Sequence, residues 1–576
     1  MSAEQFIQQK AAAAILAIYG TEVAETSLQV SVTRKEFEGD YTLVTFPLLK
    51  ITRQAPDATG NAIGQWLVDN VKEISAYNSV KGFLNLSFSP LYWNESLQAM
   101  VSDENFGQLP DTGKRIMVEF SSPNTNKPLH LGHIRNNLLG DSVSRLLKAC
   151  GNEVIKATLV NDRGVHICKS MYAWEKLFDG ATPESTGKKG DHLVGDCYVA
   201  YAKMEKEHPE IIDEVHKMLV DWEAGDPHVR ELWTMMNGWV FKGFDETYKA
   251  LGISFDKVDY EHDTYLLGKE LVQKGLDMGV FVKDPDGSVW CDLTADGLDR
   301  KLVLRGDGTS VYITQDLGTA ERRFASYNLD SHVYVVGNEQ DYHFQVLKLI
   351  LAKLGFDWAS QIYHLSYGMV ELPEGKMKSR EGTVVDADDL IQSMYEEAKK
   401  TSEESGKLAD MTEEEKDRLY HMIGLGALKY FIIKVDPKKT MLFNPKESID
   451  FNGNTGPFIQ YTHARICSIL RKATAAYGPG SIVSAVKPSA KEVRLIQLLS
   501  LYPGKVAEAG AALSPAVIAN YAYELAKEFN QYYHDTPILK EPDAAVLAYR
   551  LELINVLART LRSAMGLLGI ELPERM

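Results

Sequence analysis

The sequence predicts an α/β protein in which a nucleotide-binding parallel-sheet domain stands between a small α+β unit and an all-helical C-terminal region. Three observations predict this class. A buried-strand pattern over 115–120 runs into a loop rich in Ser, Pro and Asn, and a helical pattern begins near Leu131, which is the order that opens a nucleotide-binding unit. Short alternating stretches precede it, and after about Met411 the apolar residues have helical spacing almost throughout.

Length and composition fit a multidomain protein of the reducing cytoplasm. The 576 residues suggest about three or four domains. Apolar residues make up 45% and charged residues 24%, which excludes disordered, collagen-like and coiled-coil chains. The apolar run 11–19 is too short to span a bilayer, and no basic segment precedes it, so we expect neither a signal peptide nor a membrane partner. The five cysteines form no CxxC pair, so we expect no disulfide framework and no metal site.

The elements follow in order. Residues 1–108 are expected to form the α+β unit, with strands over 28–32, 41–46 and 80–88. A polar linker over 103–114 follows. Residues 113–410 are expected to form the nucleotide-binding domain, with further strands over 153–159, 310–313 and 332–336 and a charged helical insertion over about 170–302.

The helical region 411–576 completes the chain. Its part from Met441 onward has 14 Lys and Arg against 12 Asp and Glu, whereas the whole chain has a net charge of −17. This balance permits a polyanionic partner without requiring one.

The first chemical motif is His130-Leu131-Gly132-His133. Two histidines at the start of a helix could simply cap or pack it, or could bind zinc as an i, i+3 pair. The position directly after a buried strand favours phosphate chemistry instead, because backbone N–H groups and the helix dipole attract anions there. Imidazoles can also donate hydrogen bonds to charge that develops on phosphate.

The second motif is the lysine-rich segment 375–382, with Lys376, Lys378 and Ser379. Alone it is typical of a solvated basic loop. Together with the histidine motif it predicts two cationic segments around a triphosphate, neutralising charge where a pyrophosphate leaves.

These segments together resemble those of the class I aminoacyl-tRNA synthetases, and in detail the arginyl-tRNA synthetase family. The resemblance is carried by the runs 119–128, 161–164, 460–465 and 572–576, and it covers essentially the whole chain. It implies a Rossmann-like catalytic domain with a helical insertion, an N-terminal domain that binds the tRNA elbow, and a helical anticodon-binding domain. It also implies an arginine–tRNA ligase that activates L-arginine with ATP and transfers it from arginyl-adenylate to the 3′ end of tRNA(Arg). We expect Mg²⁺ to accompany ATP without a protein cage, and we expect a monomer.

Residue roles follow from the same resemblance. The expected catalytic residues are Lys127, His130, His133, Lys376 and Lys378, and ATP binding adds Gly132, Met369 and Met377. Glu119, Tyr312 and Asp316 are expected at the guanidinium of arginine, and Asn124 and Gln340 at its head group. Phe83, Asn85, Tyr461, Arg465 and Met576 are expected to contact tRNA.

Elementary chemistry agrees with part of this set and leaves alternatives open. Carboxylates hold a guanidinium well, and Tyr312 and Asp316, spaced i, i+4, would share one face of a helical turn. Asp316 and Glu119 could equally form structural salt bridges. Tyr461 and Arg465 could be an ordinary core aromatic and a solvated arginine.

The lysine-rich segment departs from the family pattern, because Ser379 occupies the place of its second lysine. The family pattern implies that Lys127 supplies the missing charge, and Lys378 is the alternative.

Two other functions fit the motifs less well. A nucleotidyltransferase without tRNA would not need the long helical tail. A non-catalytic tRNA-binding paralogue would not need His130, His133 and Lys376.

Overall fold

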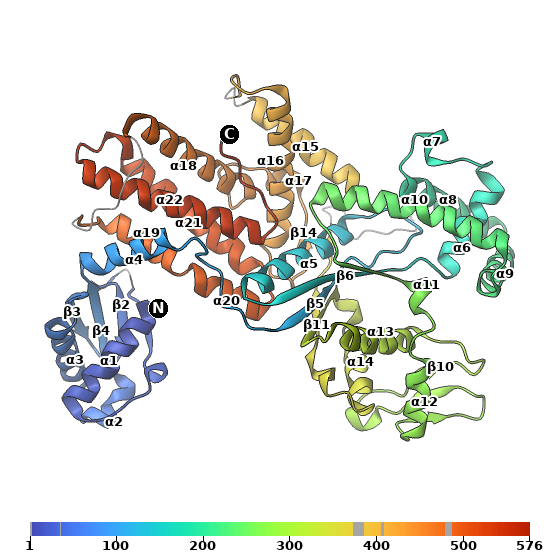
Figure 1. Cartoon of the computed structure of the whole chain (residues 1–576), viewed down its shortest axis with the longest axis horizontal. Helices are drawn as coiled ribbons and strands as arrows, with labels where there is room; N and C mark the ends of the chain where they lie inside the picture. The colour runs from blue at the N-terminus through green and yellow to red at the C-terminus, as the bar shows by residue number, and fades with distance from the viewer. Residues whose placement is uncertain (1–2, 35, 372–384, 405–407, 478–485) are drawn as a thin grey trace.

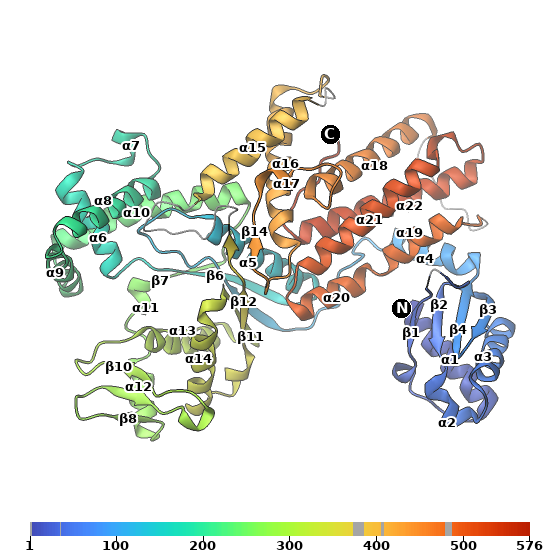
Figure 2. The same ribbon diagram turned by 180° about the vertical axis from the view of Figure 1, so that it is seen from behind.

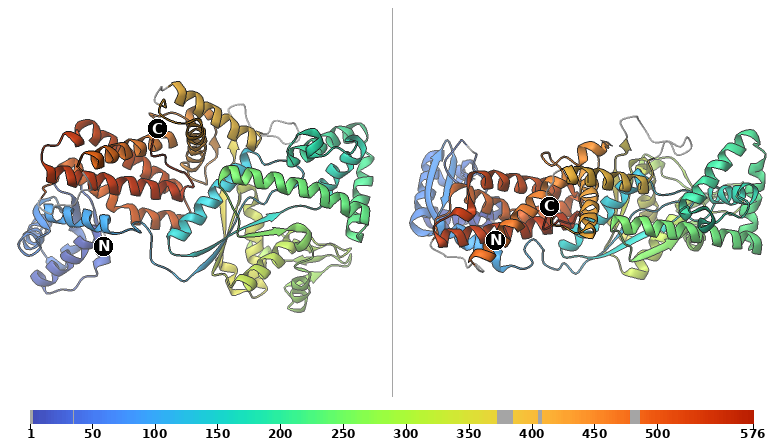
Figure 3. Two further views of the ribbon diagram at one scale, coloured as in Figure 1. Left: turned by 45° about the horizontal axis from the view of Figure 1, so that its top comes forward. Right: turned by 90° about the horizontal axis from the view of Figure 1, so that it is seen from above.

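Three architectures follow one another along the chain in this computed structural model, which describes residues 3–34, 36–371, 385–404, 408–477 and 486–576. The molecule is elongated. The N-terminal unit and the C-terminal helices lie at one end, and the helices within residues 165–251 lie at the other (Figures 1 and 3). Within these ranges, no helix is long and apolar enough to cross a membrane.

The N-terminal unit is a four-stranded antiparallel sheet of order β1-β2-β4-β3, with α3 packed on β3 and β4. The single strand expected over 80–88 is instead part of a hairpin. Lys81 and Gly82 both have positive φ, 51° and 82°, which is the backbone of a tight two-residue turn. The elements are α1 (Ala3–Tyr19), β1 (Val30–Val32), β2 (Tyr41–Val44), α2 (Leu49–Thr52), α3 (Pro56–Asn70), β3 (Ile74–Val80), β4 (Phe83–Phe88) and α4 (Pro90–Ser102).

The central domain is built on a parallel sheet of order β12-β11-β5-β6-β7. Its strands are β5 (Arg115–Glu119), β6 (Glu153–Val160), β7 (Lys257–Tyr260), β11 (Ser331–Gly337) and β12 (Ile362–Tyr367). From β5 the sheet grows through β6 and β7 on one side, and through β11 and β12 on the other. Ligands bind at the carboxyl ends of strands where the order reverses in this way. Helix α5 (Leu131–Ala149) begins at that point.

The segment expected as one helical insertion, about 170–302, is not continuous. Helices α6 (Val165–Leu177), α7 (Pro183–Thr186), α8 (Gly190–Glu207), α9 (Ile211–Ala224) and α10 (Pro227–Leu251) form its first part. Strand β7 then returns to the main sheet. After α11 (Glu261–Thr264) and α12 (Lys269–Asp277) comes a small antiparallel sheet of β8 (Phe281–Lys283), β9 (Val289–Cys291) and β10 (Lys301–Leu304). Such strands of three or four residues are too short to show a clear alternation in a charged sequence.

The prediction of a strand over 310–313 is wrong. Helix α13 (Tyr312–Tyr327) begins there, because the Val311 N–H donates to the Thr314 hydroxyl at 3.2 Å and caps the helix. Helix α14 (Asp341–Lys353) follows β11 after the short turn η4 (Asn338–Gln340).

The C-terminal part is helical and packs on both other parts. Helices α18 (Gly456–Tyr477), α21 (Ala516–Asp535) and α22 (Ala544–Leu567) contact one another, and α19 (Ala490–Ser500) contacts α4, as both faces of the molecule show (Figures 1 and 2). The Asn94 amide donates to the Val486 carbonyl at 2.9 Å across that contact. The remaining elements are α15 (Ala387–Glu404), α16 (Glu413–Ile433), β14 (Met441–Leu442), α17 (Pro445–Ser448) and α20 (Tyr502–Ala512). Strand β14 pairs with β13 (Val370–Glu371), so the chain beyond 411 also returns to the central domain.

Candidate active site

The carboxyl edge of the parallel sheet collects residues from segments far apart in sequence. Glu119 ends β5, Glu261 directly follows β7 and Gln340 lies in the turn after β11. Asn124 forms a parallel bridge with Asn161, just beyond β6. Asn124 and Gln340 are exposed at this edge, so their side chains are accessible to a ligand.

The two histidines of the first motif form a capped helix start with defined donors. The Gly132 N–H donates to His130 Nδ1 at 3.1 Å, and the His130 N–H donates to His133 Nδ1 at 3.2 Å. A neutral ring that accepts at Nδ1 has its proton on Nε2. Each ring therefore has its proton on Nε2, and in the part of the chain that the structure describes this N–H has no hydrogen-bond acceptor. A side chain at Gly132 would place its Cβ 2.9 Å from the His130 ring, so glycine is required here.

Burial keeps this pair neutral. It lowers the pKa of His130 to about 4, with Lys127 contributing, and lowers that of His133 well below its usual value. At neutral pH both histidines are hydrogen-bond donors without charge. The positive charge comes from Lys127, whose own pKa is lowered by burial. No ion pair to Lys127 is present among the described residues.

On either side of the lysine-rich segment, the structure describes the chain up to residue 371 and again from residue 385. Lys376, Met377 and Lys378 lie outside the described residues. On one flank the carbonyl of Met369, itself 41% exposed, accepts from Arg135 at 3.2 Å. On the other, the Leu131 N–H donates to the Val385 carbonyl at 3.0 Å. Both flanks therefore lie at helix α5.

Tyr312 and Asp316 share one face of α13, as their spacing predicts, and Tyr312 is 76% exposed. The Asp316 carboxylate pairs with His343 Nε2 of α14 at 2.6 Å. His343, which lies three residues after Gln340 in the sequence, thus orients Asp316.

Glu119 has a partner within the protein. Its carboxylate pairs with the guanidinium of Arg323, which also pairs with Asp259 at 2.8 Å, and all three residues are buried. The alternative of a structural salt bridge therefore describes the contact that Glu119 makes here. Its predicted contact with substrate arginine remains a prediction.

Glu261 is a candidate that sequence reasoning missed. It is buried, and burial raises its pKa to about 7; Arg163 opposes this shift, and the negative charges of Asp162 and Asp316 add to it. An acid with a raised pKa near other carboxylates is typical of a site that receives a cation. A carboxylate directly after a parallel strand would have indicated Glu261 as a site residue. The sequence analysis does not identify it, because it places 257–260 in a helical insertion.

In the N-terminal unit only one of the two predicted tRNA contacts is accessible. Phe83 is 45% exposed and lies edge-on to Phe46, 47% exposed, with 5.7 Å between ring centroids. Asn85 is 2% exposed, and its carbonyl accepts from the Thr42 hydroxyl at 2.7 Å. Phe46 is not among the predicted tRNA contacts, and its exposed ring adds to the aromatic surface that Phe83 presents.

In the C-terminal part, Tyr461, Arg465 and Met576 line one pocket of about 400 Å³. The Arg465 guanidinium lies over the Tyr461 ring, 4.8 Å from its centroid. The neighbouring His463 has a different role, because it is buried and its Nδ1 bonds the Pro573 carbonyl at 2.9 Å. The motif 460–465 therefore holds the C-terminal tail with one face and lines the pocket with the other.

Comparison with known proteins gives a consistent result. Residues 96–444 match the family model described as tRNA synthetases class I (R), catalytic domain, and residues 459–576 match the DALR anticodon binding domain. An arginine–tRNA ligase of Bacteroides thetaiotaomicron is 56% identical over 99% of this chain and 100% of its own. That of Porphyromonas gingivalis is 55% identical over 100% of both.

Solved structures agree on the fold. The arginyl-tRNA synthetase of Thermus thermophilus superposes with a TM-score of 0.83 at 25% identity over 100% of both chains. That of Plasmodium falciparum has a TM-score of 0.76 at 19% identity, covering 100% of this chain and 99% of its own.

Proposed function

Because the chain belongs to the class I arginyl-tRNA synthetase family, we propose that it is an arginine–tRNA ligase with its active site at the carboxyl edge of the parallel sheet. It would join L-arginine to ATP as arginyl-adenylate with release of diphosphate. The hydroxyl of the terminal adenosine of tRNA(Arg) would then attack the arginyl carbonyl and release AMP.

One observation carries the proposal: two neutral imidazoles, with ring centroids 3.9 Å apart, each have an Nε2–H that makes no hydrogen bond among the described residues, at the start of a buried helix. In the first step the arginine carboxylate attacks the α-phosphate in line. Negative charge then grows on the phosphate oxygens, and fixed donors stabilise that charge without reorganising. Lys127, with Lys376 and Lys378 of the lysine-rich segment, would neutralise the leaving diphosphate. Gly132, Met369 and Met377 would contact the nucleotide.

For arginine we propose a carboxylate pocket. Asp316, oriented by His343, and Glu261 would face the guanidinium, with Tyr312 beside it. Glu119 would act at the rim of the same pocket, paired with Arg323. Asn124 and Gln340, exposed at the strand ends, would bind the amino and carboxylate groups.

For tRNA we propose two contact regions. Phe83 would stack on an unpaired base of the elbow, with Asn85 beneath it. Tyr461, Arg465 and Met576 would hold a base of the anticodon in the C-terminal pocket, since aromatic and arginine side chains stack on splayed bases. Magnesium would enter bound to the phosphates of ATP. The chain would act as a cytoplasmic monomer.

Arginine-dependent exchange of ³²P between pyrophosphate and ATP, measured with and without tRNA(Arg), tests this function. We expect exchange with L-arginine and with no other standard amino acid, and charging of tRNA(Arg). Exchange without any charging would favour a nucleotidyltransferase. tRNA binding without exchange would favour a non-catalytic paralogue.

A further inference from the structure

A pocket of about 360 Å³ lies between the histidine motif and helix α8. It is lined on one side by residues 127–130 and on the other by the start of α8, with Asp386 at the junction. The proposed mechanism does not use the charged residues contributed by α8.

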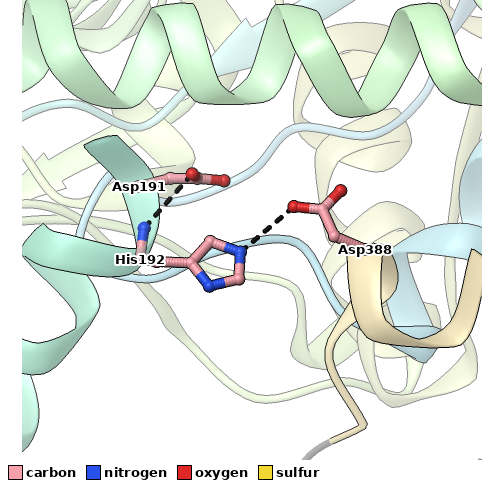
Figure 4. A group of neighbouring side chains, drawn as sticks. All are labelled: Asp191, His192 and Asp388. Atoms are coloured by element: carbon pink, nitrogen blue, oxygen red, sulfur yellow. Dashed lines mark hydrogen bonds and ion pairs between the residues drawn. The ribbon is translucent and has the colours of Figure 1, made fainter. Parts of the chain in front are cut away.

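His192, which lines this pocket, lies close enough to two carboxylates to suggest a metal site. One ligand atom each from Asp191, His192 and Asp388 lies within 4.8 Å of the others (Figure 4). The ammonium of Lys189, however, is 2.6 Å from Asp388 Oδ2 and 3.3 Å from Asp191 Oδ2. A cation of the protein already lies between the carboxylates, so these contacts describe an ion-pair network.

Lys189 uses all of its donors in this network. An ammonium has three N–H groups, and its third acceptor is the Thr247 hydroxyl of α10 at 2.5 Å. That hydroxyl in turn donates to Asp388 Oδ1 at 2.8 Å, and His192 Nε2 bonds Asp388 Oδ2 at 3.1 Å. Burial opposes ionisation of Asp388, but the hydrogen bonds from His192 and Lys189 outweigh it and lower the pKa of Asp388 to about 2.

Asp388 is tied to the histidine motif through the backbone. Its N–H donates to the Asp386 carboxylate at 2.8 Å, and Asp386 forms an antiparallel bridge with His130. On either side of that bridge, the Leu131 N–H donates to the Val385 carbonyl and the Ala387 N–H to the Leu129 carbonyl, both at 3.0 Å. Fixing Asp388, the second residue of α15, therefore fixes the segment 385–387 that is hydrogen-bonded to the backbone on both sides of His130.

Helix α8 also packs against the residues just before the motif. A Cβ on Gly195 would lie 2.8 Å from Pro128 Cδ, so glycine is needed for this approach. The helical segment 165–251 therefore contacts the chain at Pro128, two residues before His130, and, through Lys189, holds Asp388 at the start of α15.

We propose that Lys189 is a positioning residue for adenylate formation: by joining α8 and α10 to Asp388 at the start of α15, it sets the segment 385–387, which is hydrogen-bonded to residues 129–131 around His130. The role rests on the proposed function, because it acts through the histidines that contact phosphate. It touches no substrate atom itself. Loss of the ion pair should therefore lower kcat and leave intact the arginine site, whose residues lie at the carboxyl ends of β5, β7 and β11 and on α13.

The test uses Lys189→Met and Asp388→Asn in the full-length chain, singly and together, because both changes keep the shape and remove the charge. We expect each single variant to lower kcat of exchange, at saturating ATP with tRNA(Arg) present, by about tenfold, while KM for arginine stays within about twofold. Because both act through one ion pair, the double variant should also lose about tenfold rather than about a hundredfold. Lys189→Arg should retain most of the activity.

Lys188→Met is the matched control. This neighbouring lysine pairs with Asp196 at 2.6 Å, on an exposed surface, and we expect kcat within about twofold of the parent. Circular dichroism melts identify folded variants, and Lys189→Arg tests the role if Lys189→Met is unstable.

The positioning role is overturned if Lys189→Met exchanges like the parent, if the losses in the double variant multiply, or if KM for arginine rises in step with the loss in kcat. Absence of exchange in the parent chain, with and without tRNA, would overturn the proposed function and this role together.

Discussion

Glu261→Gln provides a sharp test of the arginine pocket, because the structure predicts how its effect depends on pH. Burial and the neighbouring charges of Asp162 and Asp316 raise the pKa of Glu261 to about 7, against the effect of Arg163. A raised carboxyl pKa means that the group is neutral below pH 7 and charged above it. A cationic guanidinium binds the charged form, so binding should strengthen as pH rises through 7.

The size of the effect follows from the titration. With a pKa of about 7, roughly a tenth of Glu261 is ionised at pH 6 and about nine tenths at pH 8. KM for arginine in the parent should therefore be about tenfold higher at pH 6 than at pH 8. Loss of a charge-assisted hydrogen bond costs about 1.5–3 kcal/mol, so Glu261→Gln should raise KM at pH 8 by roughly 10- to 150-fold. The variant should lose this pH dependence.

Initial rates of tRNA(Arg) charging at several arginine concentrations, with saturating ATP and tRNA, give KM at each pH. Glu270→Gln, an exposed carboxylate on α12, is the matched control and should behave as the parent. A parent KM that is constant between pH 6 and 8 would refute the assignment. So would a tenfold slope that survives in Glu261→Gln, because a group other than Glu261 would then be the source of the pH dependence.

Three further predictions concern other parts of the site. His133→Ala should lower kcat of adenylate formation on the order of 100-fold or more while arginine binding is retained, because its donor acts on developing charge; near-parental single-turnover rates would restore a purely structural role. Lys127→Ala should cost at least about tenfold more than Lys378→Ala in single-turnover adenylate formation at saturating ATP, since a half-buried lysine beside the motif is well preorganised; the reverse order would assign the missing charge to Lys378. Glu119→Gln should lower the free energy of unfolding by about 1–3 kcal/mol in urea titrations, because the buried guanidinium of Arg323 loses one charged acceptor while it keeps Asp259; unchanged stability with a large rise in KM for arginine would mean that Glu119 contacts substrate instead.

The sequence by itself determined the motifs whose chemistry is local. A strand, a polar turn and a helix start over 115–133 predict a phosphate-binding turn, because the pattern and the spacing of His130 and His133 lie within one short segment. The helical character of the C-terminal region was equally clear, since its apolar spacing repeats over many turns. The family resemblance likewise rested on short runs of sequence, namely 119–128, 161–164, 460–465 and 572–576.

Contacts between distant segments were decided only in the tertiary structure. Strand β7 is a four-residue edge strand in a charged region. Only its pairing with β6 shows that Glu261 lies at the carboxyl edge of the parallel sheet. Glu119 meets Arg323 across 204 positions, and Lys189 meets Asp388 across 199. No periodicity records such pairs, because burial and charge pairing depend on which elements pack together rather than on local spacing.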